Sequence, residues 1–434
     1  MNSIKLSDVA EILNGYAFKS KNYVNKGIRV IRIANVQNGY ICDEKPCFYP
    51  VETQDEIQQY MLREGDLLVS LTGNVGRVGI LNKDMLPAAL NQRVCCIRIN
   101  ENYVLAKYLY FYFMRSQFVR ECISASSGVA QLNLSPSWLK KKDIPVPPIE
   151  EQRRIVSRIE ELFSELDSAV ETLQKTRQQL EIYRQAVLKE AFEGKLTASW
   201  RSENTVVSIS SIYKAIKEKN NYRSTDSDCS MKLPMLPENW MWIYIGDITN
   251  GTEYGTSKKS EKNGKVPVIR MGNIQNGIID WSDLVYSSDD EEINRYLLSK
   301  NDVLFNRTNS PELVGKTAIY SSDRQAIFAG YLIRINQFDI INAKYLTYYM
   351  NSYIAKNYGN IVKTDGVNQS NINSKKLCSY PFPLCTPKEQ ERVVYELESR
   401  LSLCTNIERT VDEALQQAEA MRQSILKKAF EGAL

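Results

Sequence analysis

The stretch Val-Ile-Arg-Ile-Ala-Asn-Val-Gln-Asn-Gly at residues 30–39 recurs as Val-Ile-Arg-Met-Gly-Asn-Ile-Gln-Asn-Gly at residues 268–277, 238 positions further along the chain. The same offset relates Glu-Gln-Arg-Arg-Ile-Val at residues 151–156 to Glu-Gln-Glu-Arg-Val-Val at residues 389–394. Because chance does not hold one offset over separate segments, the chain is an internal duplication of one unit.

The two copies have diverged unevenly. Their last parts match closely, as in Leu-Lys-Glu-Ala-Phe-Glu-Gly at 188–194 and Leu-Lys-Lys-Ala-Phe-Glu-Gly at 426–432. The preceding parts share only short islands, such as Gly-Val-Ala-Gln-Leu-Asn at 128–133 and Gly-Val-Asn-Gln-Ser-Asn at 366–371. A frame kept only for stability would diverge equally throughout. The uneven divergence therefore indicates two domains that recognise different targets from one common frame.

Composition bounds the class of protein. The 434 residues are enough for two or three domains, and the hydrophobic content of 43% is ordinary for a globular protein. No apolar run approaches the roughly 18 residues that a membrane span needs, and the N-terminal segment has no signal-peptide pattern. The nine cysteines form no Cys-x-x-Cys pair, which predicts buried free thiols in a reducing compartment. These features predict a cytoplasmic protein without a membrane partner.

The sequence contains no histidine. This absence removes the commonest general base, the commonest metal ligand and every Ser-His or Cys-His nucleophile pair. The Asn/Asp-Pro-Pro-Tyr/Phe tetrapeptide that amino-methyltransferases use is also missing. We therefore expect a chain without catalytic or metal-binding residues, although an enzyme with an unfamiliar site stays an alternative.

Residues 151–192 are predicted to form one long helix, and the second copy repeats it. Apolar residues alternate at steps of three and four, as along the seam of a coiled coil. The helix-pairing residues are predicted to be Ile159, Leu162, Leu166, Leu173, Leu180, Leu397, Ile407, Val411, Met421 and Ile425. Antiparallel pairing of the two helices would give a pseudo-two-fold molecule, and packing of each helix on its own domain is the alternative.

Both helices carry end signals. Thr386 is predicted to cap the second helix, with Pro387 in its first turn and Glu389 completing a capping box. Gly194 and Gly432 stand where C-capping glycines are expected.

The parts that precede the helices combine strands and helices. Short alternating strands are followed by Asn-Gly turns at Asn38 and Asn276, and further strands are predicted at 65–70 and 301–306. Tyrosine-rich helices are predicted at 104–120 and 342–357. The expected fold class is α+β (mixed α/β), with two globular domains separated by two long antiparallel coiled-coil helices.

Polar loops follow several of these strands. They hold the residue types that contact DNA, since Arg reads guanine, Asn and Gln read adenine, and Lys, Ser and Thr contact phosphate oxygens. The candidates in the first domain are Lys19, Lys21, Thr72, Asn74, Arg77, Asn91, Gln92, Arg93, Gln131 and Asn133. Those in the second domain are Ser257, Lys258, Lys259, Asn306, Arg307, Asn309, Lys316, Asn368, Gln369 and Asn371.

Two divergent globular domains alternating with two repeated helices resemble the specificity (S) subunit of type I restriction-modification systems. The Pro-rich entry with Glu-Gln at 147–152 and 387–390, and the Ala-Phe-Glu-Gly exits, are similar to that family's conserved regions. The resemblance implies four regions. They are a first target-recognition domain at 1–147, a central conserved helical region at 148–199, a linker with the second target-recognition domain at 200–385, and a distal conserved helical region at 386–434.

The resemblance also implies a function and partners. Each target-recognition domain would read one half of a bipartite, asymmetric site in double-stranded DNA, while the helices would set the spacer and dock two methyltransferase subunits. S-adenosylmethionine would bind those subunits, and ATP and Mg would bind motor-nuclease subunits that join the complex, so no cofactor is expected on this chain. The specificity chain of a type II system and a coiled-coil scaffold without a DNA role remain alternatives.

Overall fold

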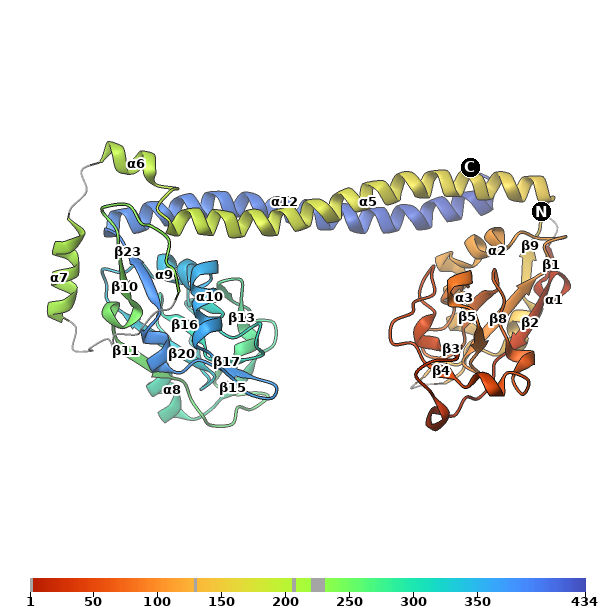
Figure 1. The fold of residues 1–434 in the computed structure, drawn as a ribbon, viewed down its shortest axis with the longest axis horizontal. Coiled ribbons are helices and arrows are strands. Elements are labelled where there is room, and N and C mark those ends of the chain that lie inside the picture. The colour runs from red at the N-terminus through yellow and green to blue at the C-terminus, as the bar shows by residue number, and fades with distance from the viewer. Residues whose placement is uncertain (1–2, 129–130, 205–207, 220–230) are drawn as a thin grey trace. The chain divides into compact units, whose positions relative to one another are not determined.

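The computed structural model describes residues 3–128, 131–204, 208–219 and 231–434. Contacts divide the chain into two compact units, one formed by residues 1–174 with 411–434 and the other by residues 175–410. Both boundaries fall inside long helices, α5 (Ile149–Phe192) and α12 (Pro387–Glu431), which are drawn in yellow-green and blue in Figure 1. Each unit therefore combines one globular domain with a part of each long helix.

The first globular domain contains three sheets. An antiparallel sheet has the order β2-β8-β5-β6, and its strands are Ala10–Asn14, Val94–Ile99, Leu67–Ser70 and Val78–Ile80. A second sheet, β4-β3-β7, is formed by Phe48–Tyr49, Ile28–Ile31 and Ala88–Leu90, with β3 and β7 parallel. The pair β1-β9, formed by Ser3–Lys5 and Asp143–Pro145, leads into α5.

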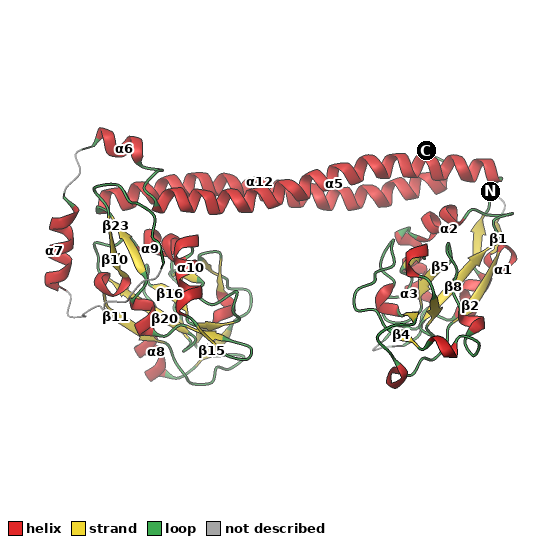
Figure 2. Ribbon diagram, in the orientation of Figure 1, coloured by secondary structure: helices red, strands yellow, loops and turns green. Residues whose placement is uncertain are grey.

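The second globular domain repeats this topology. Its sheet β11-β20-β16-β18 is formed by Thr249–Tyr254, Leu332–Gln337, Val303–Asn306 and Thr317–Ile319. The sheet β15-β12-β19 is formed by Val285–Ser287, Val266–Ile269 and Ile327–Phe328, and the pair β10-β23 by Met241–Tyr244 and Pro381–Leu384. Short additional strands are β13 (Ile274–Gln275), β14 (Ile278–Ile279), β17 (Thr308–Asn309), β21 (Thr364–Asp365) and β22 (Ser370–Asn371). The mixed α+β class predicted from the sequence is confirmed (Figure 2).

Each predicted tyrosine-rich helix is two helices. The segment 104–120 forms α2 (Ala106–Phe113) and α3 (Ser116–Ala125), and 342–357 forms α9 (Ala343–Met350) and α10 (Tyr353–Val362). In the second domain the break lies at Ser352, whose hydroxyl accepts a hydrogen bond from the backbone N–H of Ala355 and so starts a new helix. The remaining helices are α1 (Leu6–Val9), α4 (Pro136–Lys141), α6 (Ala198–Glu203), α7 (Ile209–Lys219), α8 (Asp290–Tyr296) and α11 (Ser374–Cys378).

A buried glutamine joins each long helix to the domain before it. The Gln152 amide accepts a hydrogen bond from the Leu105 N–H at 2.9 Å and donates to the carbonyl oxygens of Tyr103 and Pro147. Gln390 makes the equivalent bonds at the start of α12. Both side chains are fully buried, so the repeated glutamine has a structural reason.

The far end of each long helix packs on the domain of the other copy. Phe192 lies in the core of the second unit, 5.3 Å from the ring of Tyr345, and Phe430 lies in the core of the first, 5.2 Å from the ring of Tyr108. The repeated Ala-Phe-Glu-Gly exit is therefore part of a hydrophobic core in each unit.

Within each unit the two helices run antiparallel, as predicted. In the first unit Arg422 bonds to Asp167 while Arg154 reaches the terminal Leu434. In the second unit Arg184 Nε donates to Glu408 Oε1 at 2.8 Å.

The predicted seam needs correction at two positions. Ile407 and Met421 are 40% and 53% exposed, whereas Glu408 and Arg422, one residue later, are half-buried between the helices. The contact positions of α12 thus follow steps of four and then three from Leu397, and an ideal helix of 3.6 residues per turn allows this shift. The other predicted residues lie in half-buried or buried positions, namely Ile159, Leu162, Leu166, Leu173, Leu180, Leu397, Val411 and Ile425.

The predicted helix ends are largely correct. Thr386 Oγ1 accepts a hydrogen bond from the Glu389 N–H at 3.3 Å, and Gly194 and Gly432 have φ of 73° and 76°. The Glu389 carboxylate does not close a capping box, because it is fully buried and bonds to Thr197 and Arg201.

Most cysteines are buried free thiols, as predicted. Burial raises the pKa of the Cys95 and Cys122 thiols to about 12. Cys42 and Cys47 differ, since both are only half-buried. Among the described residues, no helix is both long enough and apolar enough to cross a bilayer.

Candidate nucleic-acid interface

The repeated segment that begins at Val30 and Val268 forms a side-chain-supported turn. Asn35 Oδ1 accepts a hydrogen bond from the Arg32 N–H at 2.9 Å, and its Nδ2 donates to the Cys42 oxygen at 2.9 Å. Asn273 makes the same bonds, with Arg270 at 2.8 Å and Asp280 at 2.9 Å. This turn holds the glutamine that follows two residues later at one position in both domains.

That glutamine contacts a basic residue of the loop after the central strand. Arg77 Nη1 donates to Gln37 Oε1 at 2.9 Å, and Lys316 Nζ donates to Gln275 Oε1 at 3.0 Å. The loops that carry Arg77 and Lys316 follow β5 and β16. Each cation is therefore held in place and is half-buried.

A Thr–Asn hydrogen bond, which we call the clamp, joins this loop to the segment Gly-Val-x-Gln-x-Asn at residues 128–133 and 366–371. Thr72 Oγ1 donates to Asn133 Oδ1 at 2.8 Å, and in the second domain Asn371 Nδ2 donates to Thr308 Oγ1 at 2.7 Å. The chain separation of each pair is about 60 residues, so the contact is tertiary. It explains why the asparagine of the turn occurs in both copies.

Backbone hydrogen bonds bring further loops to the same place. Leu71 N–H donates to Arg93 oxygen at 3.0 Å, and Arg307 N–H donates to Tyr331 oxygen at 3.0 Å. Next to the clamp residue Asn133, Leu134 donates its backbone N–H to the Leu71 oxygen. These bonds place positions 71 and 93, or 307 and 331, side by side.

A fifth segment completes the group. Gln92 N–H donates to Tyr16 oxygen at 3.0 Å, and Gly330 N–H donates to Thr256 oxygen at 2.8 Å. Segments from five separate parts of the sequence thus meet in each domain. This group of segments, which we call the loop face, carries most of the residues predicted to contact DNA.

The predicted contact residues differ in exposure. In the first domain Lys19, Lys21, Asn74, Gln92, Arg93, Gln131 and Asn133 are exposed, Arg77 and Asn91 are half-buried, and Thr72 is buried. In the second domain Ser257, Lys258, Lys259, Asn368 and Gln369 are exposed, Arg307, Asn309, Lys316 and Asn371 are half-buried, and Asn306 is buried.

Two of these residues, Asn306 and Lys258, are poorly placed to contact DNA. Asn306 has no exposed surface, and neither polar atom of its side chain has a hydrogen-bond partner among the described residues. Lys258 Nζ lies 2.6 Å from Asp289 and 3.6 Å from Glu292, and the hydrogen bond to Asp289 raises the pKa of its ammonium group. Asn306 is therefore inaccessible in this conformation, and the positive charge of Lys258 is balanced by two neighbouring carboxylates.

Arg307 is the best-positioned base-reading candidate of the second domain. Its guanidinium carbon lies 4.9 Å from the centroid of the Tyr254 ring, and its Nη2 is 3.3 Å from Asn371 Oδ1. The aromatic face and the amide orient the guanidinium, while the residue keeps part of its surface exposed.

Sequence reasoning missed an aromatic cluster in the first domain. Tyr16 lies 5.0 Å from Phe18 and 5.2 Å from Tyr60, and Phe18 lies 4.9 Å from Tyr49. This cluster supports the segment with Lys19 and Lys21. The alternation of aromatic and basic residues in Phe-Lys-Ser-Lys-Asn-Tyr at 18–23 was the available signal.

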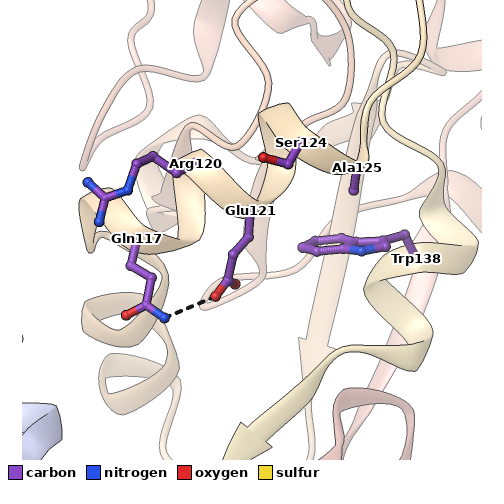
Figure 3. A pocket seen from close by; sticks show the side chains of 6 residues that line it. All are labelled: Gln117, Arg120, Glu121, Ser124, Ala125 and Trp138. Carbon is purple, nitrogen blue, oxygen red and sulfur yellow. Dashed lines mark hydrogen bonds between the residues drawn. The ribbon is translucent and has the colours of Figure 1, made fainter.

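A pocket lies elsewhere on the first domain, between α3 and α4 (Figure 3). It is open, measures about 480 Å³, and is lined by Gln117, Arg120, Glu121, Ser124, Ala125 and Trp138. Gln117 Nε2 donates to Glu121 Oε1 at 3.1 Å across one turn of α3. None of the predicted DNA-contact residues lines this pocket.

Known proteins align with almost the whole length of this chain. The specificity subunit of the type I restriction enzyme EcoBI of Escherichia coli is 27% identical over 441 residues, covering 99% of this chain and 85% of that protein. The EcoKI specificity subunit of E. coli strain K12 is 27% identical over 440 residues, covering 99% and 88%.

Solved structures share the fold. A chain from a study of complex assembly and conformational transition in a type I R-M system aligns with a TM-score of 0.69 at 18% identity, covering 100% of this chain and 98% of that one. The HsdS subunit from Thermoanaerobacter tengcongensis aligns with a TM-score of 0.51 at 18% identity, covering 100% and 97%. The EcoBI and EcoKI specificity subunits do not favour the alternative assignment to a type II system.

The family model of the type I restriction modification DNA specificity domain matches twice, over residues 1–181 and 237–417, which are most of the two copies. With both repeats matched and specificity subunits aligned end to end, the chain belongs to the family of type I restriction-modification specificity subunits.

Proposed function

We propose that this chain is the DNA sequence-recognition subunit of a type I restriction-modification complex, in which each globular domain reads one half of a bipartite, asymmetric site. The regions 1–147 and 200–385 would read DNA, and the helical regions 148–199 and 386–434 would set the spacer. The chain would act in the cytoplasm, on cellular and incoming DNA.

One observation carries the proposal. The two domains have the same strand orders and the same clamp between loops, yet equivalent loop positions differ in chemistry. Leu71 corresponds to Arg307, and Arg93 corresponds to Tyr331. A constant frame that presents different side chains suits the reading of two different base sequences.

The helices supply a surface for partner subunits. In the second unit Ile182, Tyr395 and Leu403 are 70%, 63% and 63% exposed, although they are large apolar residues on helices with a mostly polar surface. Exposed apolar groups of this kind favour a protein partner. We propose that two methyltransferase subunits bind along the helices and methylate adenine with S-adenosylmethionine, and that motor-nuclease subunits with ATP and Mg join them.

The chain itself would contribute binding and no chemistry. Duplex DNA presents two half-sites on antiparallel strands, so a pseudo-two-fold protein can address both. Divergence of the two domains then makes the combined site non-palindromic.

Methylation-aware sequencing of host DNA tests the proposal. Cells with the intact operon should show adenine methylation at one bipartite motif, and deletion of this gene should abolish it. An unchanged methylation pattern would favour a scaffold without a DNA role.

Matched charge reversals test the assignment of domains to half-sites. Arg93→Glu should relax or abolish recognition of one half-site, and Arg307→Glu should do so for the other, because each lies on the loop face of a different domain. If either variant weakened recognition of both half-sites equally, the one-domain-one-half assignment would be wrong.

A further inference from the structure

The turn Gly366–Asn371 exposes the side chains of Val367 and Gln369 to solvent. Val367 is fully exposed, at 100%. Gln369 is also exposed, and its side-chain amide makes no hydrogen bond to any residue that the structure describes. The turn is held by Gly366 N–H, which donates to the Gln369 oxygen at 2.8 Å, and by the side chains of Ser370 and Asn371, which bond to Asp365 and Thr308.

The first domain has the corresponding sequence at residues 128–133, of which the structure describes Gly128 and residues 131–133. Ser127 and Asn133 exchange backbone hydrogen bonds of 3.0 and 2.8 Å, and Gln131 is exposed without a side-chain hydrogen bond to the described residues. Val129 corresponds to Val367 in sequence and lies outside the described residues.

The asparagine has a structural reason in both copies and the glycine has one in the first copy, whereas the glutamine has none. Gly128 has φ of 108°, and a Cβ there would lie 2.3 Å from the Gln131 oxygen. The asparagine forms the clamp to Thr72 or Thr308. Stability of the turn therefore does not account for a glutamine and a valine that reappear at the same positions in both copies.

We propose that this turn is a DNA anchor common to both domains, in which Gln131 and Gln369 each donate a hydrogen bond to a phosphate oxygen and, in the second domain, Val367 packs on deoxyribose. The proposal deepens the proposed function and rests on it. Phosphate and sugar are the same at every base pair, so residues that contact them need not change when the target sequence changes. Residues that read base edges must change, as positions 71 and 307 do.

The anchor is coupled directly to a base-reading position. Ile372 N–H, next to the clamp residue Asn371, donates to the Arg307 oxygen at 2.9 Å. Leu134 N–H makes the equivalent bond to Leu71 at 2.7 Å. A backbone contact at the turn would thus fix the register in which the neighbouring residue meets a base.

Binding of DNA duplexes to the assembled methyltransferase complex tests the proposal. Fluorescence anisotropy would compare a cognate duplex with one whose second half-site has been replaced, for wild type, Gln369→Ala and Arg307→Ala. Asn336→Ala is the matched control, because this exposed amide lies near the far end of β20 from the loop face.

Gln369→Ala should weaken binding to both duplexes by the same factor, about tenfold for a hydrogen bond to a charged group, with an unchanged melting temperature and an unchanged methylated motif. Arg307→Ala should weaken binding to the cognate duplex selectively, and Asn336→Ala should change neither.

Two results would overturn the anchor. One is a loss in Gln369→Ala that is confined to the cognate duplex, which would make Gln369 a base reader. The other is wild-type affinity in the double variant Gln131→Ala/Gln369→Ala. A wild-type complex with no preference for the cognate duplex would contradict the proposed function instead, and a uniform loss in the variants would then still support the backbone contact.

Discussion

The ring of Phe430 packs edge-on against the ring of Tyr108, with 5.2 Å between the ring centroids and an interplanar angle of 62°. Phe430 comes from the helix of the second copy, whereas Tyr108 comes from the domain of the first. The counterpart contact joins Phe192 to Tyr345 in the second unit. Each copy therefore completes the hydrophobic core of the other.

Phe430→Ala should destabilise the first unit, by about 3–5 kcal/mol, because a buried aromatic ring is replaced by a cavity. Hydrogen exchange followed by mass spectrometry should show faster exchange in α2, with little change in α9. Phe192→Ala is the mirror-image control and should accelerate exchange in α9. Equal acceleration in both domains for either variant would contradict a local role.

Gln152→Ala should loosen the joint between α5 and the first domain. The change leaves the Leu105 N–H and two backbone carbonyls without partners in a buried site, at a cost of about 1–3 kcal/mol for each unsatisfied group. Urea denaturation should show the loss, and Gln416→Ala, at an exposed position of α12, should not. A loss of stability no larger than that of Gln416→Ala would show that the joint does not depend on the Gln152 amide.

The Arg184–Glu408 pair should contribute a coupling energy of about 1 kcal/mol between the helices, measured by a double-mutant cycle with Arg184→Ala and Glu408→Ala. The hydrogen bond from Arg184 holds the pKa of Glu408 below its ordinary value of 4.5. The contribution is therefore present at pH values above 4.5 and is lost as the pH falls through the lowered pKa. A coupling energy that did not decline in acid would contradict this origin.

Arg307→Lys should relax the preference at one base position of a single half-site while largely preserving overall affinity. Lysine keeps the positive charge but lacks the planar fork that Tyr254 and Asn371 orient in the arginine. Sequencing of the methylated motif in cells would measure the change. Lys300→Arg, at an exposed position of the same domain outside the predicted contact residues, is the control. An unchanged motif in Arg307→Lys would remove Arg307 from the base-reading set.

Thiol labelling of the native protein at pH 8 should modify Cys42 and Cys47 before the buried cysteines. Burial raises the pKa of Cys95 and Cys122 to about 12, so these thiols stay protonated and inaccessible. Peptide mass spectrometry after alkylation would assign each site. Labelling of Cys95 in the folded protein at the rate of Cys42 would contradict the buried arrangement.

Periodicity and duplication were enough to predict the long helices and their antiparallel pairing. They misplaced Ile407 and Met421, because a step of three and a step of four are equally compatible with an apolar pattern. The charged residues Glu408 and Arg422 occupy the contact positions by pairing with Arg184 and Asp167, which a hydrophobic pattern cannot reveal.

The loop face was harder to predict than the helices. The sequence indicated which residue types belong to a DNA contact, and the structure brings most of them together. The clamp between Thr72 and Asn133 joins segments 61 residues apart, and no local rule links them. The burial of Asn306 and the ion pair of Lys258 likewise depend on tertiary neighbours.

The exchange of helix ends between the copies also has a consequence for the order in which the protein is made. The ribosome delivers the first domain before the second, but the core of the first domain includes Leu426, Ala429 and Phe430, which follow the second domain in the chain. The core of the second domain, as far as the structure describes it, draws on residues between Val187 and Leu401. The domain that is translated first thus finishes folding after the second domain, and its incomplete core needs shielding until residues 426–430 have been synthesised.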